Sequence, residues 1–123
     1  MTCRPHLVSL RIARPGNKYP APVNGPANGD RGFDCSGLTK AAYFAAGIRL
    51  PRTAQTQYNA GPRVPVDRLE PGDLVFFGSS TTHVTHVGLA LSATKMINAP
   101  DFGELVGIDQ IGARALGATR PMP

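Results

Sequence analysis

Apolar residues recur at helical spacing in one stretch of the first half of the chain, at Leu38, Ala41, Ala42 and Ala45. Residues 39–46 hold no proline and no glycine, and Gly47 then supplies a helix stop. The pattern predicts a helix of about three turns. Cys35 falls in its first turn.

The second half of the chain reads mainly as extended segments. An extended link at 48–52 leads to a short helix that Thr53 caps and that ends before Gly61. Apolar and alternating patterns then predict strands, at 74–77, 86–91, 95–98 and 105–108. A helix followed by a sheet indicates an α+β fold with one core.

The strands at 86–91 and 95–98 are expected to form a hairpin. A three-residue loop between them would place Asn98 opposite Gly88, on the same face as His86 and within side-chain reach. A two-residue loop would turn Asn98 to the other face. His86 otherwise shares its face with small residues, whereas the alternate residues are apolar and are expected to pack the core.

Cys35 is the candidate nucleophile. A lone cysteine is most often a small buried hydrophobe. Here glycines flank it, and the start of a helix favours the thiolate, so we expect its pKa to be lowered. A base is also required, and His86 with Asn98 as an orienting amide would complete an activated-nucleophile arrangement.

Length and composition limit the number of domains, the fold class and the routes of export that the chain can have. A chain of 123 residues holds one domain, and its 14 glycines and 12 prolines argue against a helical bundle. No apolar run approaches the roughly 18 residues of a membrane helix. The first residues lack the apolar core of a signal peptide, so export would need a missing N-terminus, another route or lysis.

The net charge of +5 is concentrated near the N-terminus, where residues 1–31 hold five basic side chains and one acidic side chain. We therefore divide the chain into a basic arm rich in proline and glycine, 1–30, and a domain, 31–123. Without interleaved aromatic residues the arm is a weak nucleic-acid signal, and we expect no specific nucleic-acid partner. Attraction to an anionic polymer such as a cell wall is equally compatible.

Five blocks in order carry a family resemblance: GFDCSGL (32–38), LPRTAQTQ (50–57), PGDLVFF (71–77), THVGLAL (85–91) and MINAP (96–100). Together they resemble the NlpC-like cysteine peptidases of bacterial cell-wall metabolism. The resemblance implies a papain-like α+β fold and a triad of cysteine, histidine and a polar residue. It also implies cleavage of peptidoglycan stem peptides after D-glutamate, often at the γ-D-glutamyl–diaminopimelate bond, at the cell wall or outside the cell.

The resemblance also assigns roles. Cys35 matches the nucleophile, His86 the base and Asn98 the third, orienting position, which in the family is more usually histidine. No metal or other cofactor is implied, and we expect a monomer.

Four further residues are implied in substrate binding. Asp34 and Ser36 match positions beside the nucleophile, and Arg52 matches a segment that faces the cleft. Asp34 could pair with a substrate cation and Arg52 with a free carboxylate. Tyr19 is the candidate for a tyrosine that the family carries before the cysteine, at a longer spacing here. The chain lacks the tryptophan of that segment.

Three alternatives remain open at this point. The altered N-terminal segment could leave a peptidoglycan-binding protein with little or no turnover. The same triad could serve an amidase or acyltransferase, because it forms a thioester with any suitable acyl group. Finally, Cys3, His6, His83 and His86 have pair spacings that zinc tolerates.

Overall fold

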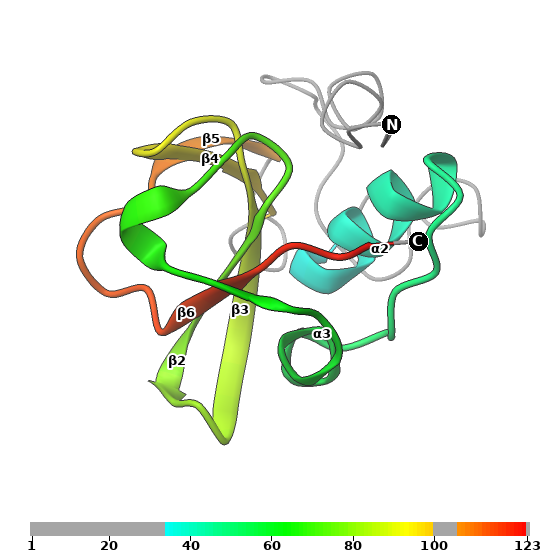
Figure 1. Cartoon of the computed structure of the whole chain (residues 1–123), viewed down its shortest axis with the longest axis horizontal. Helices are drawn as coiled ribbons and strands as arrows, with labels where there is room; N and C mark the ends of the chain where they lie inside the picture. Colours follow the sequence, from blue (N-terminus) through cyan, green and yellow to red (C-terminus); the bar gives the residue numbers. More distant parts are fainter. Residues whose placement is uncertain (1–33, 100–105, 123) are drawn as a thin grey trace.

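The computed structural model describes residues 34–99 and 106–122, and their antiparallel strands form one sheet in the order β1-β6-β2-β3-β4-β5 (Figure 1). The helical elements are α2 (Cys35–Ala45), α3 (Ala54–Ala60) and the 3₁₀ helix η2 (Val66–Arg68). The strands are β1 (Arg63–Val64), β2 (Leu74–Ser80), β3 (His83–Ala90), β4 (Lys95–Asn98), β5 (Gly107–Gln110) and β6 (Gly117–Thr119). The expected α+β fold is confirmed.

Both expected helices begin and end close to their sequence signals. Asp34 caps α2, and its side chain accepts a hydrogen bond from the N–H of Gly37 at 2.7 Å. Beyond the last turn, Gly47 takes a φ of 87°, a left-handed conformation that favours glycine. Thr53 and Thr56 form a reciprocal capping box at the start of α3, which ends at Gly61.

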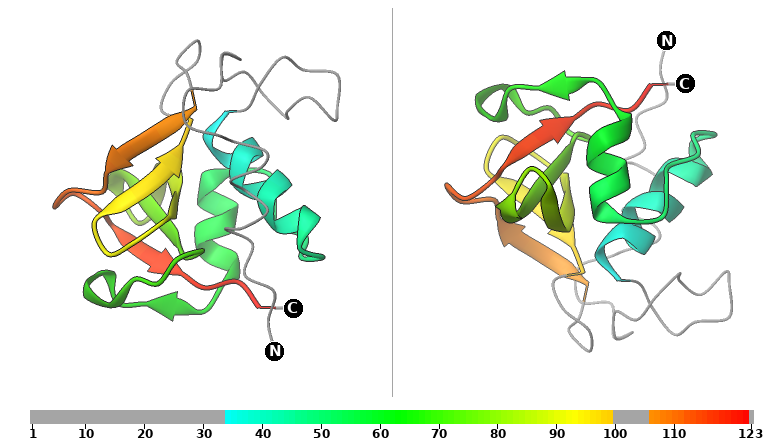
Figure 2. Two further views of the ribbon diagram at one scale, coloured as in Figure 1. Left: turned by 90° about the horizontal axis from the view of Figure 1, so that it is seen from above. Right: turned by 90° about the horizontal axis from the view of Figure 1, so that it is seen from below.

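The main core lies between the two helices and one face of the sheet (Figure 2). Its buried side chains include Leu38, Tyr43, Tyr58, Phe76, Leu89 and Ile97. Each fully buried leucine, isoleucine or phenylalanine contributes about 1.5–3 kcal/mol relative to exposure. This apolar contact holds α2, and with it Cys35, against the sheet.

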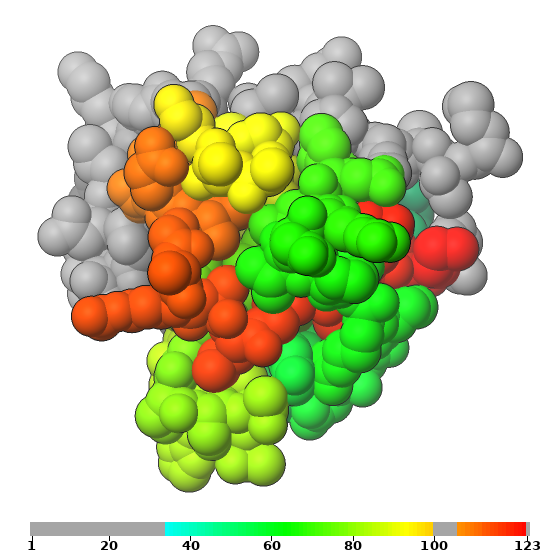
Figure 3. Space-filling model, turned by 60° about the vertical axis from the view of Figure 1, so that its left-hand side comes forward, coloured from blue at the N-terminus to red at the C-terminus, as the bar shows by residue number. Residues whose placement is uncertain are grey.

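The opposite face of the sheet is also covered by apolar side chains. A second apolar cluster contains Leu69, Val75, Ala90, Met96, Ile111 and Ala118. The segment around η2 and the segment leading into β6 lie next to each other on this surface (Figure 3). The sulfur of Met96 would lie 2.4 Å from a Cβ at Gly88, so the small residues beside His86 make room for packing.

Two strands were missed by the sequence patterns. β1 has two residues between Pro62 and Pro65, and β6 consists of a glycine, an alanine and a threonine. Neither shows the alternation of apolar and polar residues that predicts a strand. They pair with each other, and β6 also pairs with β2, so long-range partners create both strands.

None of the helices among the described residues is long and apolar enough to cross a membrane.

Candidate active site at the edge of β3

One edge of β3 faces β4. The N–H of Leu91, directly after β3, donates to the carbonyl of Lys95 (2.9 Å), whereas the N–H of Ala90 donates to the carbonyl of Asp73 beside β2 (2.8 Å). Because backbone groups alternate sides along a strand, the odd-numbered residues direct theirs toward β4. The pairing of β3 with β4 runs from Ala90 to Leu89 and does not extend to the residues before Leu89.

Cys35 lies against the same edge of β3, beyond the part that pairs with β4. Its thiol donates a long, weak hydrogen bond to the carbonyl oxygen of Thr85, at 3.9 Å. A backbone hydrogen bond from Val87 also reaches the sulfur. These two residues stand on either side of His86. The first turn of α2 is thus seated against the strand that carries the candidate base.

A β-bulge shapes this part of β3. Phe77 of β2 pairs with His86, but the next residue, Gly78, pairs with Val84, so Thr85 is an extra residue. Bulges re-aim neighbouring groups and are common beside active sites. Gly78 permits this close approach, because a Cβ there would lie 2.1 Å from the carbonyl oxygen of His83.

The predicted register of the β3–β4 hairpin is confirmed. Leu89 pairs with Ile97 and Ala90 with Met96, which is the register that a three-residue loop gives. The same register places Asn98 across from Gly88, on the His86 side of the sheet.

Asn98 is 2% exposed, and its Oδ1 has no hydrogen-bond partner among the described residues. A buried acceptor without a partner is costly and calls for an explanation. The His86 ring lies on this side and packs against Phe77, with ring centroids 5.7 Å apart. An imidazole N–H that reached Asn98 would satisfy the buried oxygen.

The pKa of the Cys35 thiol differs from the expectation. Burial raises it above its ordinary value, and the charge of Asp34 raises it further. Backbone hydrogen bonds from Val87 and Ser36 and the charge of Arg52 act in the opposite direction without reversing the shift. The prediction of a lowered pKa is therefore wrong for the isolated thiol. The physical reason is that burial removes water from the sulfur, and the negative charge of the capping carboxylate of Asp34 adds to this effect.

Asp34, Ser36 and Arg52 lie together and contact one another. The guanidinium of Arg52 donates to the Asp34 carboxylate at 2.8 Å and to the Ser36 hydroxyl at 2.7 Å. The Asp34 and Arg52 side chains remain 37% and 35% exposed. Each charge therefore has a partner and also an accessible side.

Sequence reasoning missed two glutamines of α3. Gln57 is buried, and its amide donates to the carbonyls of Ser36 (3.1 Å) and Pro51 (2.9 Å). Its carbonyl oxygen accepts from the hydroxyl of Thr39 at 2.6 Å. Gln55 accepts from the N–H of Val84 at 2.8 Å. Both glutamines lie in the block LPRTAQTQ, whose polar residues gave the available signal.

Other sequence candidates lie elsewhere. Tyr19, Cys3 and His6 fall outside the described residues. Within the described ranges, no group of three or more histidine, cysteine or acidic side chains could hold a metal ion. His83 is exposed near the tip of the β2–β3 hairpin.

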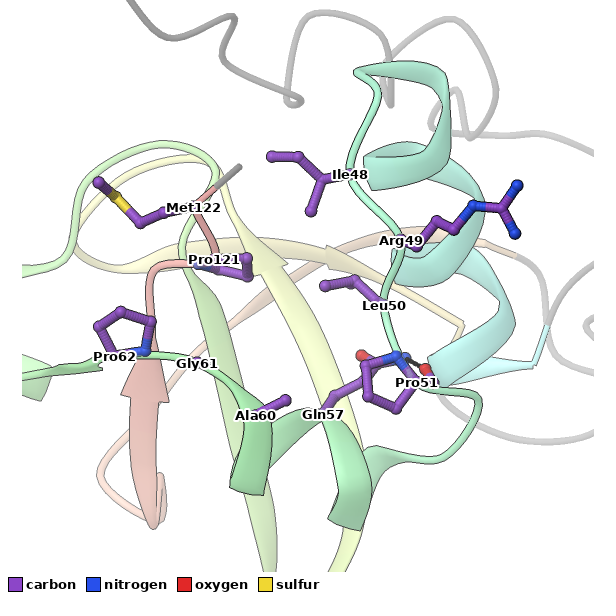
Figure 4. Close-up of a pocket in the computed structure, with 10 residues that line it drawn as sticks. All are labelled: Ile48, Arg49, Leu50, Pro51, Gln57, Ala60, Gly61, Pro62, Pro121 and Met122. Carbon is purple, nitrogen blue, oxygen red and sulfur yellow. Dashed lines mark hydrogen bonds between the residues drawn. The ribbon is translucent and has the colours of Figure 1, made fainter.

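A pocket of about 260 Å³ opens between the α2–α3 link, the end of α3 and the C-terminal residues Pro121 and Met122 (Figure 4). Its lining is largely apolar. It includes Gln57 and Pro51 but none of the three candidate catalytic residues.

Residues 20–117 match the NlpC/P60 family, so this chain belongs to that family. It is 46% identical over 88 residues to "Probable endopeptidase p60" of Listeria monocytogenes, covering 72% of this chain and 17% of that protein. It is 41% identical over 81 residues to "Gamma-D-glutamyl-L-lysine dipeptidyl-peptidase" of Bacillus subtilis, covering 63% of this chain and 27% of that protein. The chain thus spans about a quarter or less of these relatives.

Solved structures agree with the fold. The NlpC/p60 domain of the peptidoglycan hydrolase SagA superposes with a TM-score of 0.80 at 26% identity, covering 96% of this chain and 97% of that chain. RipD of Mycobacterium tuberculosis, described as a non-catalytic NlpC/p60 protein adapted to peptidoglycan binding, superposes with a TM-score of 0.73 at 25% identity, covering 97% of this chain and 95% of that chain. These matches confirm the papain-like α+β architecture. They also include a member without catalysis.

Proposed function

We propose that this domain is a cysteine endopeptidase that cleaves peptidoglycan stem peptides on the carboxyl side of D-glutamate. The observation that carries the proposal is the seating of the Cys35 thiol against β3 at Thr85 and Val87, on either side of His86. A nucleophile and a base held by one strand edge suit acyl transfer. The names of the relatives supply the substrate class, and one of them specifies a γ-D-glutamyl bond.

In the proposed mechanism, His86 accepts the thiol proton and the sulfur of Cys35 attacks the carbonyl carbon of the D-glutamyl residue. The C–N bond then breaks, and the leaving amine takes the proton from His86. The acyl group stays on sulfur as a thioester. His86 next takes a proton from water, whose oxygen displaces the sulfur, and the thiol regains its proton.

The raised pKa of Cys35 makes the base essential in this mechanism. Burial and Asp34 both disfavour the thiolate, so the thiol is mostly protonated near neutral pH unless a neighbouring group takes its proton. Asn98 would hold the ring of His86 in the productive orientation through its buried Oδ1.

The paired charges of Asp34 and Arg52 suit a zwitterionic ligand. A stem peptide carries a free carboxylate at the γ-linked D-glutamate, which Arg52 can bind from its accessible side. Asp34 can bind an ammonium group of the same stem. Because the two side chains already form a pair, a ligand that offers both charges would extend the pair, whereas a singly charged ligand would compete with it.

A second candidate function is peptidoglycan binding without turnover. It is favoured by the similarity to the non-catalytic RipD and by the raised pKa of Cys35. An amidase or acyltransferase would use the same thioester chemistry and differ only in the acyl acceptor or donor.

The test uses the full chain with a tetrapeptide stem that contains diaminopimelate and with its α-amidated D-glutamate form. We expect release of the diaminopimelate dipeptide from the first, loss of release in Cys35→Ala, and slower release from the amidated stem. Casein should stay intact. Binding of both stems without cleavage, by folded protein with reduced Cys35, would favour the non-catalytic candidate.

A further inference from the structure

Helix α3 contacts both elements that carry the candidate site: α2, which carries Cys35, and β3, which carries His86. It contacts the first turn of α2 on one side and the start of β3 on the other, through side chains of Gln57 and Gln55. Residues two apart on a helix point in nearly opposite directions, since each residue turns about 100°. Two glutamines at this spacing can therefore hold two different elements at once.

Gln57 uses its whole amide group on the α2 side. Its Nε2 donates to the carbonyl of Ser36, the residue after the nucleophile, and to the carbonyl of Pro51, which precedes Arg52. Its Oε1 accepts from the hydroxyl of Thr39 at 2.6 Å, and the oxygen of that hydroxyl also lies 3.1 Å from the Ser36 carbonyl oxygen. These groups are buried, so their hydrogen bonds are strong and costly to lose.

Gln55 makes the complementary contacts on the β3 side. Its Oε1 accepts from the N–H of Val84, the residue before the bulge, and its Nε2 donates to the carbonyl of Thr81 at 3.0 Å. Val84 is followed by Thr85, which accepts the hydrogen bond from the thiol. The residue next to Cys35 and the residue next to Thr85 are thus both hydrogen-bonded to side chains of one short helix, α3.

We propose that Gln57 and Gln55 are positioning residues that fix Cys35 against the His86 segment of β3 and thereby set the proton transfer from the thiol to His86. This inference rests on the proposed function for the role of His86. It adds that α3, which contributes none of the three candidate catalytic residues, determines the geometry of the pair. A displacement of about 1 Å at such a site can reduce the rate by roughly a hundredfold.

The test compares Gln57→Met, which keeps the length of the side chain and removes its hydrogen bonds, with Tyr43→Phe. Tyr43 lies in the same helix as Cys35, and its hydroxyl makes a buried hydrogen bond of 2.5 Å to the carbonyl of Gly72. The control therefore costs a buried hydrogen bond from α2 far from the thiol. Three quantities are measured on the full chain. They are Tm, the alkylation rate of Cys35 by iodoacetamide from about pH 5.5 to about pH 9.5, which spans neutral pH and the ordinary thiol pKa of about 8.5, and kcat and KM on the stem peptide.

We expect both variants to lose stability. Gln57→Met should also lose roughly tenfold to a hundredfold in alkylation rate below neutral pH and in kcat, with a smaller change in KM. Tyr43→Phe should keep the alkylation profile of the parent protein. Gln55→Met, which alters a half-buried position, should shift the profile in the same direction and serves if Gln57→Met does not fold.

Two outcomes would overturn the inference. One is an alkylation profile of both glutamine variants that superposes on that of the parent protein. The other is an equal loss in Tyr43→Phe. Alkylation needs no stem peptide, so it separates this inference from the proposed function. If the parent protein cleaves no stem peptide, the endopeptidase proposal fails. If Cys35 is nevertheless alkylated more slowly in Gln57→Met than in the parent protein, the positioning role is supported.

Discussion

Two aspartate–arginine pairs in this domain have similar chemistry and different surroundings. Asp73, in the turn before β2, is fully buried, and both of its oxygens accept from Arg120 at 2.8 Å. One of them also accepts from the N–H of Glu70. Asp34, at the start of α2, caps the helix and pairs with Arg52, but both side chains are about one third exposed.

The difference separates structural from functional use of the same residue pair. Asp73 itself is fully buried and both of its oxygens are used by protein donors. The ion pair with Asp73 raises the pKa of Arg120, whose side chain is 31% exposed and also pairs with Glu70 at 3.4 Å. Around Asp34 both members of the pair are partly exposed, and the neighbouring Cys35 thiol is desolvated. Closed polar groups hold a fold together, whereas groups that are only partly satisfied can still bind a ligand.

The largest effect is expected from His86→Ala, in the candidate active site beside the Asp34–Arg52 pair. Because His86 is the proposed acceptor of the thiol proton, kcat/KM should fall by roughly 10²–10⁴-fold. The half-buried position makes a large loss of stability unexpected. Stem-peptide kinetics together with thermal unfolding would check this. Near-parental turnover in the folded variant would remove His86 from the mechanism.

At the Asp73–Arg120 pair, Asp73→Asn should lower the stability of the fold. It removes the buried charge that accepts from Arg120 and leaves the partly exposed guanidinium with Glu70 as its ionic partner, which should lower the free energy of unfolding by about 1–3 kcal/mol. Turnover per folded molecule should not change. Urea unfolding and active-site titration would measure the two quantities separately. Loss of activity at full stability would show that the comparison assigns the two pairs wrongly.

Asn98→Ala tests the unsatisfied oxygen. If Asn98 orients the ring of His86, activity should fall by roughly tenfold to a hundredfold, less than in His86→Ala, because Asn98 carries no proton. Because Asn98 is buried and its oxygen is proposed to accept from His86, the truncation should also lower the free energy of unfolding by about 1–3 kcal/mol, so turnover is compared per folded molecule. A silent variant would leave Asn98 without an orienting role, despite the confirmed register.

The smallest effect is expected from Asp34→Asn, which keeps a good helix cap and removes the charge. Asp34 raises the pKa of the Cys35 thiol and Arg52 lowers it, so the variant should have a lower thiol pKa. At any pH below that pKa, alkylation of Cys35 should become a few-fold faster. Arg52→Met should shift the profile to higher pH. Iodoacetamide rates followed by mass spectrometry give both signs, and shifts in the same direction would contradict this account.

The parts of this site that depend on local sequence could be predicted. Asp34 and Gly47 mark the ends of α2, and the three-residue loop sets the register that brings Asn98 to the His86 side. These features depend on capping and on hairpin geometry, which neighbouring residues determine.

Other parts depend on residues far apart in the chain. The bulge at Thr85 requires the pairing of β2 with β3, and the bonds of Gln57 join residues 21 apart. The direction of the Cys35 pKa shift also depends on burial, which a helix-start motif does not reveal. The mutual pairing of Asp34 with Arg52 was missed for the same reason, although both residues were identified.

The proposed boundary between an arm and a domain at residue 31 stays a prediction. The family match begins at residue 20, so part of the proposed arm aligns with the family. Tyr19 lies just before that match and outside the described residues.

The central claim is that Cys35 carries the acyl group of the stem peptide. The most direct test is acid quenching of the protein during turnover, followed by intact-mass and peptide mass spectrometry. This account predicts a mass increase equal to the D-glutamyl acyl fragment, located on the peptide that contains Cys35 and absent from Cys35→Ala. Cleavage of the stem by a Cys35→Ala variant, or an acyl adduct on Cys3 instead, would contradict it.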